Sequence, residues 1–113
     1  DSNTIDRSEW TGSDFEFLIT GDLEISKDDF DSLMTPNSME WKKVLKNDWL
    51  YYQVGEDEFS YSWEMPGIQM TFNKEITFEK AKNIADEIIL NINNTGQHAE
   101  LRILDSRDVH GFD

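Results

Sequence analysis

Residues 49–72 read WLYYQVGEDEFSYSWEMPGIQMTF, and their pattern gives the clearest indication of the fold class. Phe59, Tyr61 and Trp63 alternate with polar residues, which is the period-2 pattern of a half-buried strand. An aromatic run precedes them and a second alternating run follows, each separated by a segment with Gly or Pro, residues that favour turns. We therefore predict three consecutive antiparallel strands at 49–54, 59–63 and 68–72, with turns at 55–58 and 66–67.

The strongest helical pattern follows this stretch. Thr77 is a typical helix N-cap, and the apolar residues of 78–92 recur with the 3.6-residue period of one helix face. Gly96 suits the left-handed conformation that often follows a helix. Alternating apolar residues at 99–103 predict a last strand, and the apolar run at 15–19 predicts a first one.

The segment between the first strand and residue 49 is less regular. An N-cap at Ser26 and helical spacing of the apolar residues after it predict a short helix that ends before Pro36. A second helix over 38–46 is favoured, because its apolar residues fall on one helix face and its lysines off it. The alternative is a strand over 40–46 that turns at 47–48.

These elements predict an α+β fold, with a single mainly antiparallel sheet of about five strands and two to three helices packed on one face. The length of 113 residues suits a single domain, which we place at 1–113 with polar ends at 1–13 and 105–113. If the strands before and after the long helix are adjacent and parallel, their connection should be right-handed.

The charge of the chain restricts its partners. Ten Lys and Arg oppose 24 Asp and Glu, which gives a net charge of −14, and the excess is greatest in residues 1–37. A domain with this charge is repelled by nucleic acid and by anionic membranes, and it attracts basic proteins. Because the chain has no apolar run of about 18 residues, we expect no membrane-spanning helix.

Few residue patterns indicate chemistry. The chain has no cysteine, which excludes disulfides, thiolate catalysis and cysteine-ligated metals. His98 and His110 lie in different segments and lack the spacing of metal ligands. Glu64 is the one candidate for a catalytic carboxylate, but the strand alternation places it on the face opposite Tyr61 and Trp63. We therefore expect no enzyme activity, no catalytic residue, no metal and no cofactor.

The cellular location is predicted from cysteine usage and from the start of the chain. The lack of cysteine fits the reducing cytoplasm, and no signal peptide is present. Because the chain begins at Asp1 and not at Met, an exported protein whose signal was removed is the alternative.

Acidic residues near aromatic ones indicate a protein-binding surface. Acids at 56–58 lie at a predicted hairpin tip beside Tyr and Trp, which interfaces favour as anchors, and a second acidic cluster lies at 22–31. We expect Tyr52 and the turn acids to be exposed, and the alternating aromatics of 59–63 to face the core. The predicted partner-binding residues are Asp22, Glu24, Asp28, Asp29, Asp31, Tyr51, Tyr52, Glu56, Asp57, Glu58, Tyr61 and Trp63.

In overall character, a small acidic α+β chain with these features resembles the immunity proteins that protect bacteria from their own polymorphic or contact-dependent growth inhibition toxins. The resemblance covers the whole chain and implies tight, stoichiometric inhibition of a basic toxin domain, often a nuclease. Two alternatives remain open. One is a nucleic-acid mimic that inhibits a DNA-binding enzyme, and the other is an exported binding domain.

Overall fold

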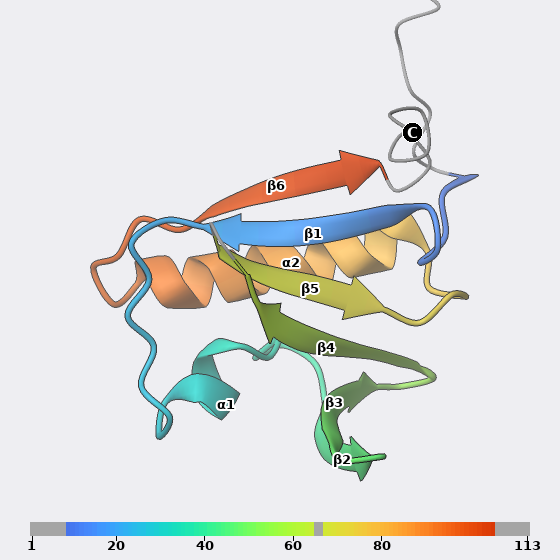
Figure 1. Ribbon diagram of the computed structural model, residues 1–113, viewed down its shortest axis with the longest axis horizontal. Coiled ribbons are helices and arrows are strands. Elements are labelled where there is room, and N and C mark those ends of the chain that lie inside the picture. Colours follow the sequence, from blue (N-terminus) through green and yellow to red (C-terminus); the bar gives the residue numbers. More distant parts are fainter. Residues whose placement is uncertain (1–8, 65–66, 106–113) are drawn as a thin grey trace, which may run out of the picture.

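The computed structural model describes residues 9–64 and 67–105. Within these residues the chain forms six strands and two helices (Figure 1). In chain order they are β1 (Phe15–Thr20), α1 (Phe30–Leu33), β2 (Lys42–Lys46), β3 (Trp49–Val54), β4 (Asp57–Trp63), β5 (Gly67–Phe72), α2 (Phe78–Asn93) and β6 (Glu100–Asp105).

The strands form one sheet in the order β2-β3-β4-β5-β1-β6, and each neighbouring pair is antiparallel. This confirms the predicted α+β class, with six strands in place of about five. The strands before and after α2, β5 and β6, are not adjacent, because β1 lies between them and pairs with both. A crossover between neighbouring parallel strands is therefore not formed.

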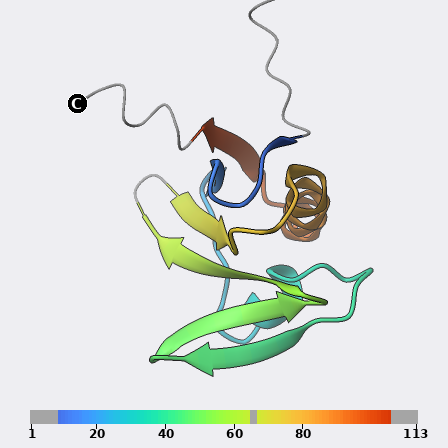
Figure 2. The same ribbon diagram turned by 90° about the vertical axis from the view of Figure 1, so that its right-hand side faces the viewer.

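One face of the sheet forms the core with α2. Phe15, Phe17 and Ile19 alternate along β1 as buried residues, and Phe17 lies opposite Met70 on β5 and Ile103 on β6. Figure 2 shows α2 on one side of the sheet, alongside the β5-β1-β6 end and away from the β2–β3 hairpin. The core face of β2, β3 and β4 therefore needs a different cover.

The helix α2 has the structure that its sequence predicts. The Thr77 side chain accepts a hydrogen bond from the Lys80 backbone N–H at 3.2 Å, which confirms the predicted N-cap. The predicted apolar stripe faces the sheet, where Ala81, Ile84, Ala85, Ile88 and Ile92 are buried. Burial of such a stripe stabilises a helix more than its intrinsic propensity does.

The predicted helix over 38–46 is wrong, and the strand alternative is correct. Asn47 and Asp48 both have positive φ, 51° and 67°, which is the requirement of the two-residue turn that joins hairpin strands. The turn sets Leu45 opposite Leu50 and pairs every residue of β2 with one of β3. This ladder satisfies backbone groups and outweighs the helical spacing of a few apolar residues. Lysines along this edge strand also discourage pairing with another chain.

The first helix is shorter than predicted and begins later. Its N-cap is Asp29 and not Ser26. The Ser26 hydroxyl instead accepts from the Asp29 backbone N–H at 3.2 Å, within the turn that precedes α1. Asn91 of α2 fixes the end of α1, because its side-chain amide donates to the carbonyls of Leu33 and Thr35 at 3.2 and 3.0 Å. These bonds hold the end of α1 against α2.

Gly12 provides a test of backbone packing at the N-terminal side of the sheet. Its N–H donates to the Lys74 carbonyl at 3.0 Å, and a Cβ placed on it would lie 1.7 Å from the Asn73 carbonyl oxygen. We expect Gly12→Ala to lower the free energy of unfolding by about 2 kcal/mol, because backbone atoms must move to make room. Urea denaturation measures this loss. The exposed neighbour Ser13 supplies the control, since Ser13→Ala should leave stability within about 0.5 kcal/mol of the original; equal losses would refute the close approach.

Candidate interaction surface

Large apolar side chains are exposed mainly at one end of the sheet. Among the described residues six such side chains are exposed, and four of them lie on β2, β3 and β4: Leu45 (68%), Trp49 (48%), Leu50 (37%) and Trp63 (60%). The other two, Leu90 on α2 and Leu104 on β6, belong to other elements. Single exposed apolar residues are common, whereas a group of them indicates an interaction site.

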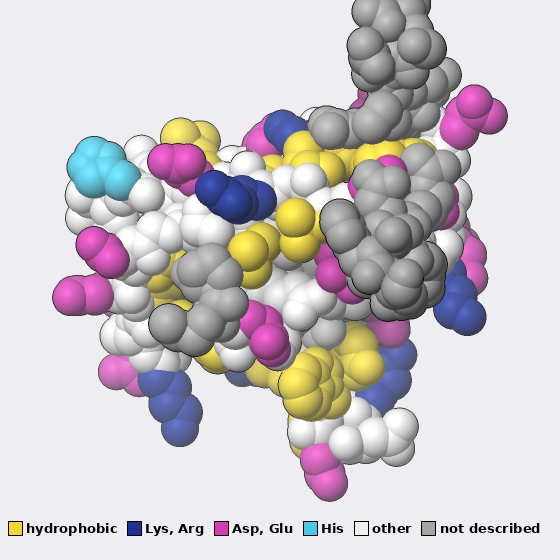
Figure 3. Space-filling view, turned by 45° about the horizontal axis from the view of Figure 1, so that its top comes forward, with side chains coloured by type: hydrophobic (Ala, Val, Ile, Leu, Met, Phe, Trp, Pro, Cys, Tyr) yellow, Lys and Arg dark blue, Asp and Glu magenta, His cyan; other side chains and the backbone are white. Residues whose placement is uncertain are grey.

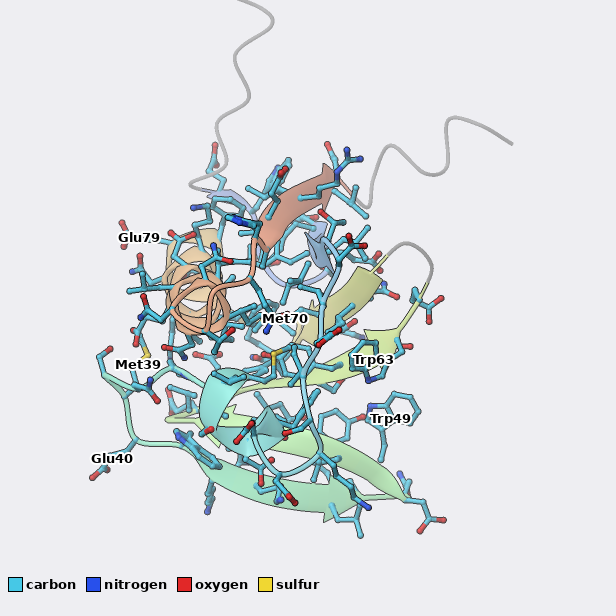
Figure 4. The ribbon with its side chains drawn as sticks, turned by 90° about the vertical axis from the view of Figure 1, so that its left-hand side faces the viewer. Met39, Glu40, Trp49, Trp63, Met70 and Glu79 are labelled. Carbon is cyan, nitrogen blue, oxygen red and sulfur yellow. The ribbon has the colours of Figure 1, made fainter. Side chains whose placement is uncertain are left out.

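The strand register explains why three of these side chains are exposed. Leu50 lies two residues before the buried Tyr52 on β3 and therefore on the same face of the sheet. Leu45 lies opposite Leu50 on β2. Trp63 lies opposite the buried Ile68. All three therefore belong to the core face of the sheet, at the end that α2 does not cover. Trp49 lies on the other face by the same alternation, and Figure 4 shows it at the same end of the sheet as Trp63.

The segment before α1, with α1 itself, covers this end only in part and leaves a groove. The volume of the groove is about 400 Å³. The Phe30 ring lies 6.5 Å from the Trp63 ring and 5.7 Å from the Tyr61 ring, centroid to centroid. We call this the Trp63 groove; its lining residues are Ile25, Lys27, Phe30, Asp31, Lys43, Leu50, Tyr52 and Trp63.

A polar network closes one wall of the Trp63 groove. The Asp31 carboxylate accepts a hydrogen bond from the Tyr52 hydroxyl through Oδ1 at 2.6 Å, and from Lys43 Nζ through Oδ2 at 2.6 Å. The bond from Lys43 and then that from Tyr52 lower the pKa of Asp31 below its usual value. Burial, and then the bond to Asp31, raise the pKa of Tyr52. The network joins α1 to β2 and β3.

The lowered pKa of Asp31 predicts a pH effect on stability. A carboxyl group whose folded pKa lies below its unfolded pKa contributes stability above the unfolded pKa, and this contribution is lost as the pH falls through the folded pKa. We expect Asp31→Asn to be less stable than the original chain at neutral pH, and we expect this difference in stability to shrink as the pH falls through the folded pKa of Asp31. Urea denaturation across this range measures the difference. Asp86→Asn, which removes an exposed helical ion pair with Lys82, is the control. The prediction is contradicted if the difference in stability from the original chain disappears at low pH for Asp86→Asn but not for Asp31→Asn.

The acids of the β3–β4 hairpin tip are largely engaged within the molecule. Asp57 forms an ion pair with Lys80 at 2.5 Å and accepts a hydrogen bond from Asn73 at 2.8 Å. Glu58 forms an ion pair with Lys46 at 2.8 Å. Glu56 alone of the three is exposed. The acids of the tip are therefore less available to a partner than the sequence predicts.

The structure separates the predicted binding residues into groups. It brings Asp31, Tyr52 and Trp63 together at the Trp63 groove, with the Tyr61 ring against Phe30. Tyr52 is buried, contrary to expectation, because its ring packs against Trp41, Phe59 and Tyr61 on the core face and its hydroxyl bonds to Asp31 of α1. Tyr61 faces the core as predicted, and its hydroxyl donates to the Met34 carbonyl at 2.7 Å.

The remaining predicted residues lie outside the groove lining. Tyr51 is half-buried on the opposite face of β3, where Lys46 Nζ lies 4.9 Å from its ring centroid. Asp22, Glu24, Asp28 and Asp29 are all exposed along the segment that precedes α1. Figure 3 shows acidic side chains spread over one face of the molecule, with hydrophobic side chains exposed between them.

Sequence reasoning missed seven residues of this surface, namely Ile25, Lys27, Phe30, Lys43, Leu45, Trp49 and Leu50. The signal for two of them was present, because a two-residue turn at 47–48 places Leu45 opposite Leu50. The role of Phe30 depends on where α1 docks, and the sequence carries no local signal for that.

Within residues 9–64 and 67–105 no group of three or more His, Asp or Glu side chains is placed to hold a metal ion. Glu64 is exposed and accepts a hydrogen bond from the Ser62 hydroxyl at 2.6 Å. His98 is exposed, and His110 lies outside the described residues. In the same part of the chain, no helix is long and apolar enough to cross a membrane.

Comparison with protein-family models, with curated proteins and with solved structures gave no match for this chain.

Proposed function

We propose that this protein binds a basic protein and inhibits it stoichiometrically, in the manner of an immunity protein that neutralises a bacterial toxin domain. The observation that carries the proposal is the grouping of Leu45, Trp49, Leu50 and Trp63 at one end of the sheet in a chain of net charge −14. Protein interfaces combine a few large anchors with a charged rim. This end of the molecule has both parts.

The charge and the apolar group have different roles in such a complex. An excess of acids attracts a basic partner over a distance and raises the association rate, particularly at low salt. Burial of apolar side chains then slows dissociation. The groups with shifted pKa, Asp31, Tyr52 and Tyr61, are hydrogen-bonded between α1 and the sheet or to the backbone that follows α1, so they support the surface.

Affinity capture tests the proposal. The full chain is immobilised, a lysate of the source organism is applied, and bound proteins are eluted with a salt gradient and identified by mass spectrometry. We expect one basic protein to be retained beyond about 0.5 M salt, where screening is severe. Addition of the chain should abolish the activity of that protein at a molar ratio of about one. Release of many DNA-binding proteins at low salt would instead support a nucleic-acid mimic.

The exposed acids at this end of the sheet should control the association rate. Asp28 and Glu64 are exposed next to this end of the sheet, so Asp28→Lys with Glu64→Lys should slow association with the captured protein about tenfold at low salt. Stopped-flow fluorescence measures the rate. Glu79→Lys with Glu100→Lys makes the same change in net charge on other elements and should slow association less. Equal slowing would mean that only the net charge matters.

A further inference from the structure

The lining of the Trp63 groove specifies the part of the partner that it accepts. We infer that the groove receives one large apolar side chain, carried on a segment of the partner that has Lys or Arg on either side of it. This inference rests on the proposed function, because it identifies the docking element of the proposed basic partner.

Apolar side chains line both sides of the Trp63 groove. Leu50 and Trp63 lie on the core face of the sheet and yet are 37% and 60% exposed, so their unburied surface points toward the space that an anchor would fill. Phe30 and Ile25 form the opposing side from α1 and the segment before it. A volume of about 400 Å³ accommodates a large side chain. Covering these residues would remove the exposed apolar surface that the fold leaves at this end.

Charged side chains surround the apolar part of the Trp63 groove. Asp31 and Lys43 neutralise each other within the lining, and Lys27 is the remaining cation there. The neighbouring positions are acidic and exposed: Asp28 and Asp29 precede Phe30, and Asp48 lies in the turn between Leu45 and Leu50. The balance is therefore negative around an apolar centre. This arrangement complements cations flanking an apolar side chain and repels an acidic segment.

Three short peptides, titrated into the full-length chain, test whether the Trp63 groove accepts an apolar anchor and whether it favours cations beside that anchor. The peptides are acetyl-Lys-Phe-Lys-amide, acetyl-Glu-Phe-Glu-amide and acetyl-Lys-Gly-Lys-amide, titrated into ¹⁵N-labelled protein at low salt. We expect the Lys-Phe-Lys peptide to shift the indole N–H signal of Trp63 and the amide of Leu50 in a saturable way. Its dissociation constant should be about tenfold lower than that of the Glu-Phe-Glu peptide. The Lys-Gly-Lys peptide, which lacks the anchor, should produce no saturable shift of Trp63.

Two variants locate the binding. Trp63→Ser should abolish saturable binding of the Lys-Phe-Lys peptide, whereas Leu90→Ser should not change it, because Leu90 is an equally exposed apolar residue on α2. The inference is overturned if the acidic peptide binds as tightly as the basic one, or if no peptide shifts the Trp63 signal. Shifts confined to α2 or β6 overturn it as well.

The outcomes also separate this inference from the proposed function. Binding of the Lys-Phe-Lys peptide at Trp63, without capture of a basic protein, would reject the proposed function and keep the groove. Capture of a basic protein that is equally strong with Trp63→Ser would keep the proposed function and reject the groove.

Discussion

We expect replacement of Trp63 by Ser to weaken binding of the captured partner about 30-fold, which corresponds to about 2 kcal/mol, and to leave the stability of the isolated protein unchanged. The effect on affinity follows from the loss of a large aromatic anchor beside Phe30 and Leu50. Stability should not fall, because Trp63 is 60% exposed and little buried surface is lost. Surface plasmon resonance gives the affinity, and urea denaturation gives the free energy of unfolding.

Leu90→Ser is the matched control for this prediction. Leu90 is 59% exposed, so the two substitutions remove similar amounts of exposed apolar surface from different elements. We expect Leu90→Ser to leave the affinity unchanged. Equal losses of affinity in both variants would show that general surface hydrophobicity, and not the Trp63 groove, governs binding.

The second large effect concerns the core. We expect Phe17→Ala to lower the free energy of unfolding by about 4 kcal/mol. Phe17 is fully buried, and its ring centroid lies 5.1 Å from that of Phe15, 5.5 Å from Phe72 and 5.9 Å from Phe78. Its removal leaves a cavity where β1, β5 and α2 meet and breaks three aromatic contacts.

A comparison along the same strand tests this result. Leu18 is adjacent to Phe17 but lies on the opposite face and is only partly buried, so Leu18→Ala should cost much less. Phe17→Leu keeps most of the volume and provides a measurable variant if Phe17→Ala does not fold. A loss for Leu18→Ala that equals the loss for Phe17→Leu or exceeds it would contradict the assignment of the two faces of β1.

Local patterns predicted most of the fold. The alternation in 59–63 and the apolar period in 78–92 each specify one element, and both elements form as expected. The segment 38–46 was ambiguous, because a few apolar residues satisfy helical and strand spacing over so short a length. The turn at 47–48 favours the strand, because it places residues 42–46 opposite 49–53, where only an extended segment can form the hydrogen bonds of a hairpin.

The candidate surface was harder to predict because it depends on tertiary cover. The alternation correctly assigns Trp63 to the core face, but its exposure results from the position of α2 over the other end of the sheet. Tyr52 shows the opposite case, because α1 brings Asp31 to its hydroxyl and so buries a residue that was expected to be free. Neither outcome is encoded by spacing within a single strand.

Hydrogen–deuterium exchange of the complex with the captured basic protein locates the surface that the partner covers. We propose that the partner binds at the end of the sheet formed by the Trp63 groove and the β2–β3 hairpin. Binding there predicts slower exchange in residues 25–31, 43–52 and 61–64, with little change in α2 and β6. Protection confined to α2 or β6, with unchanged exchange around Trp63, would contradict it.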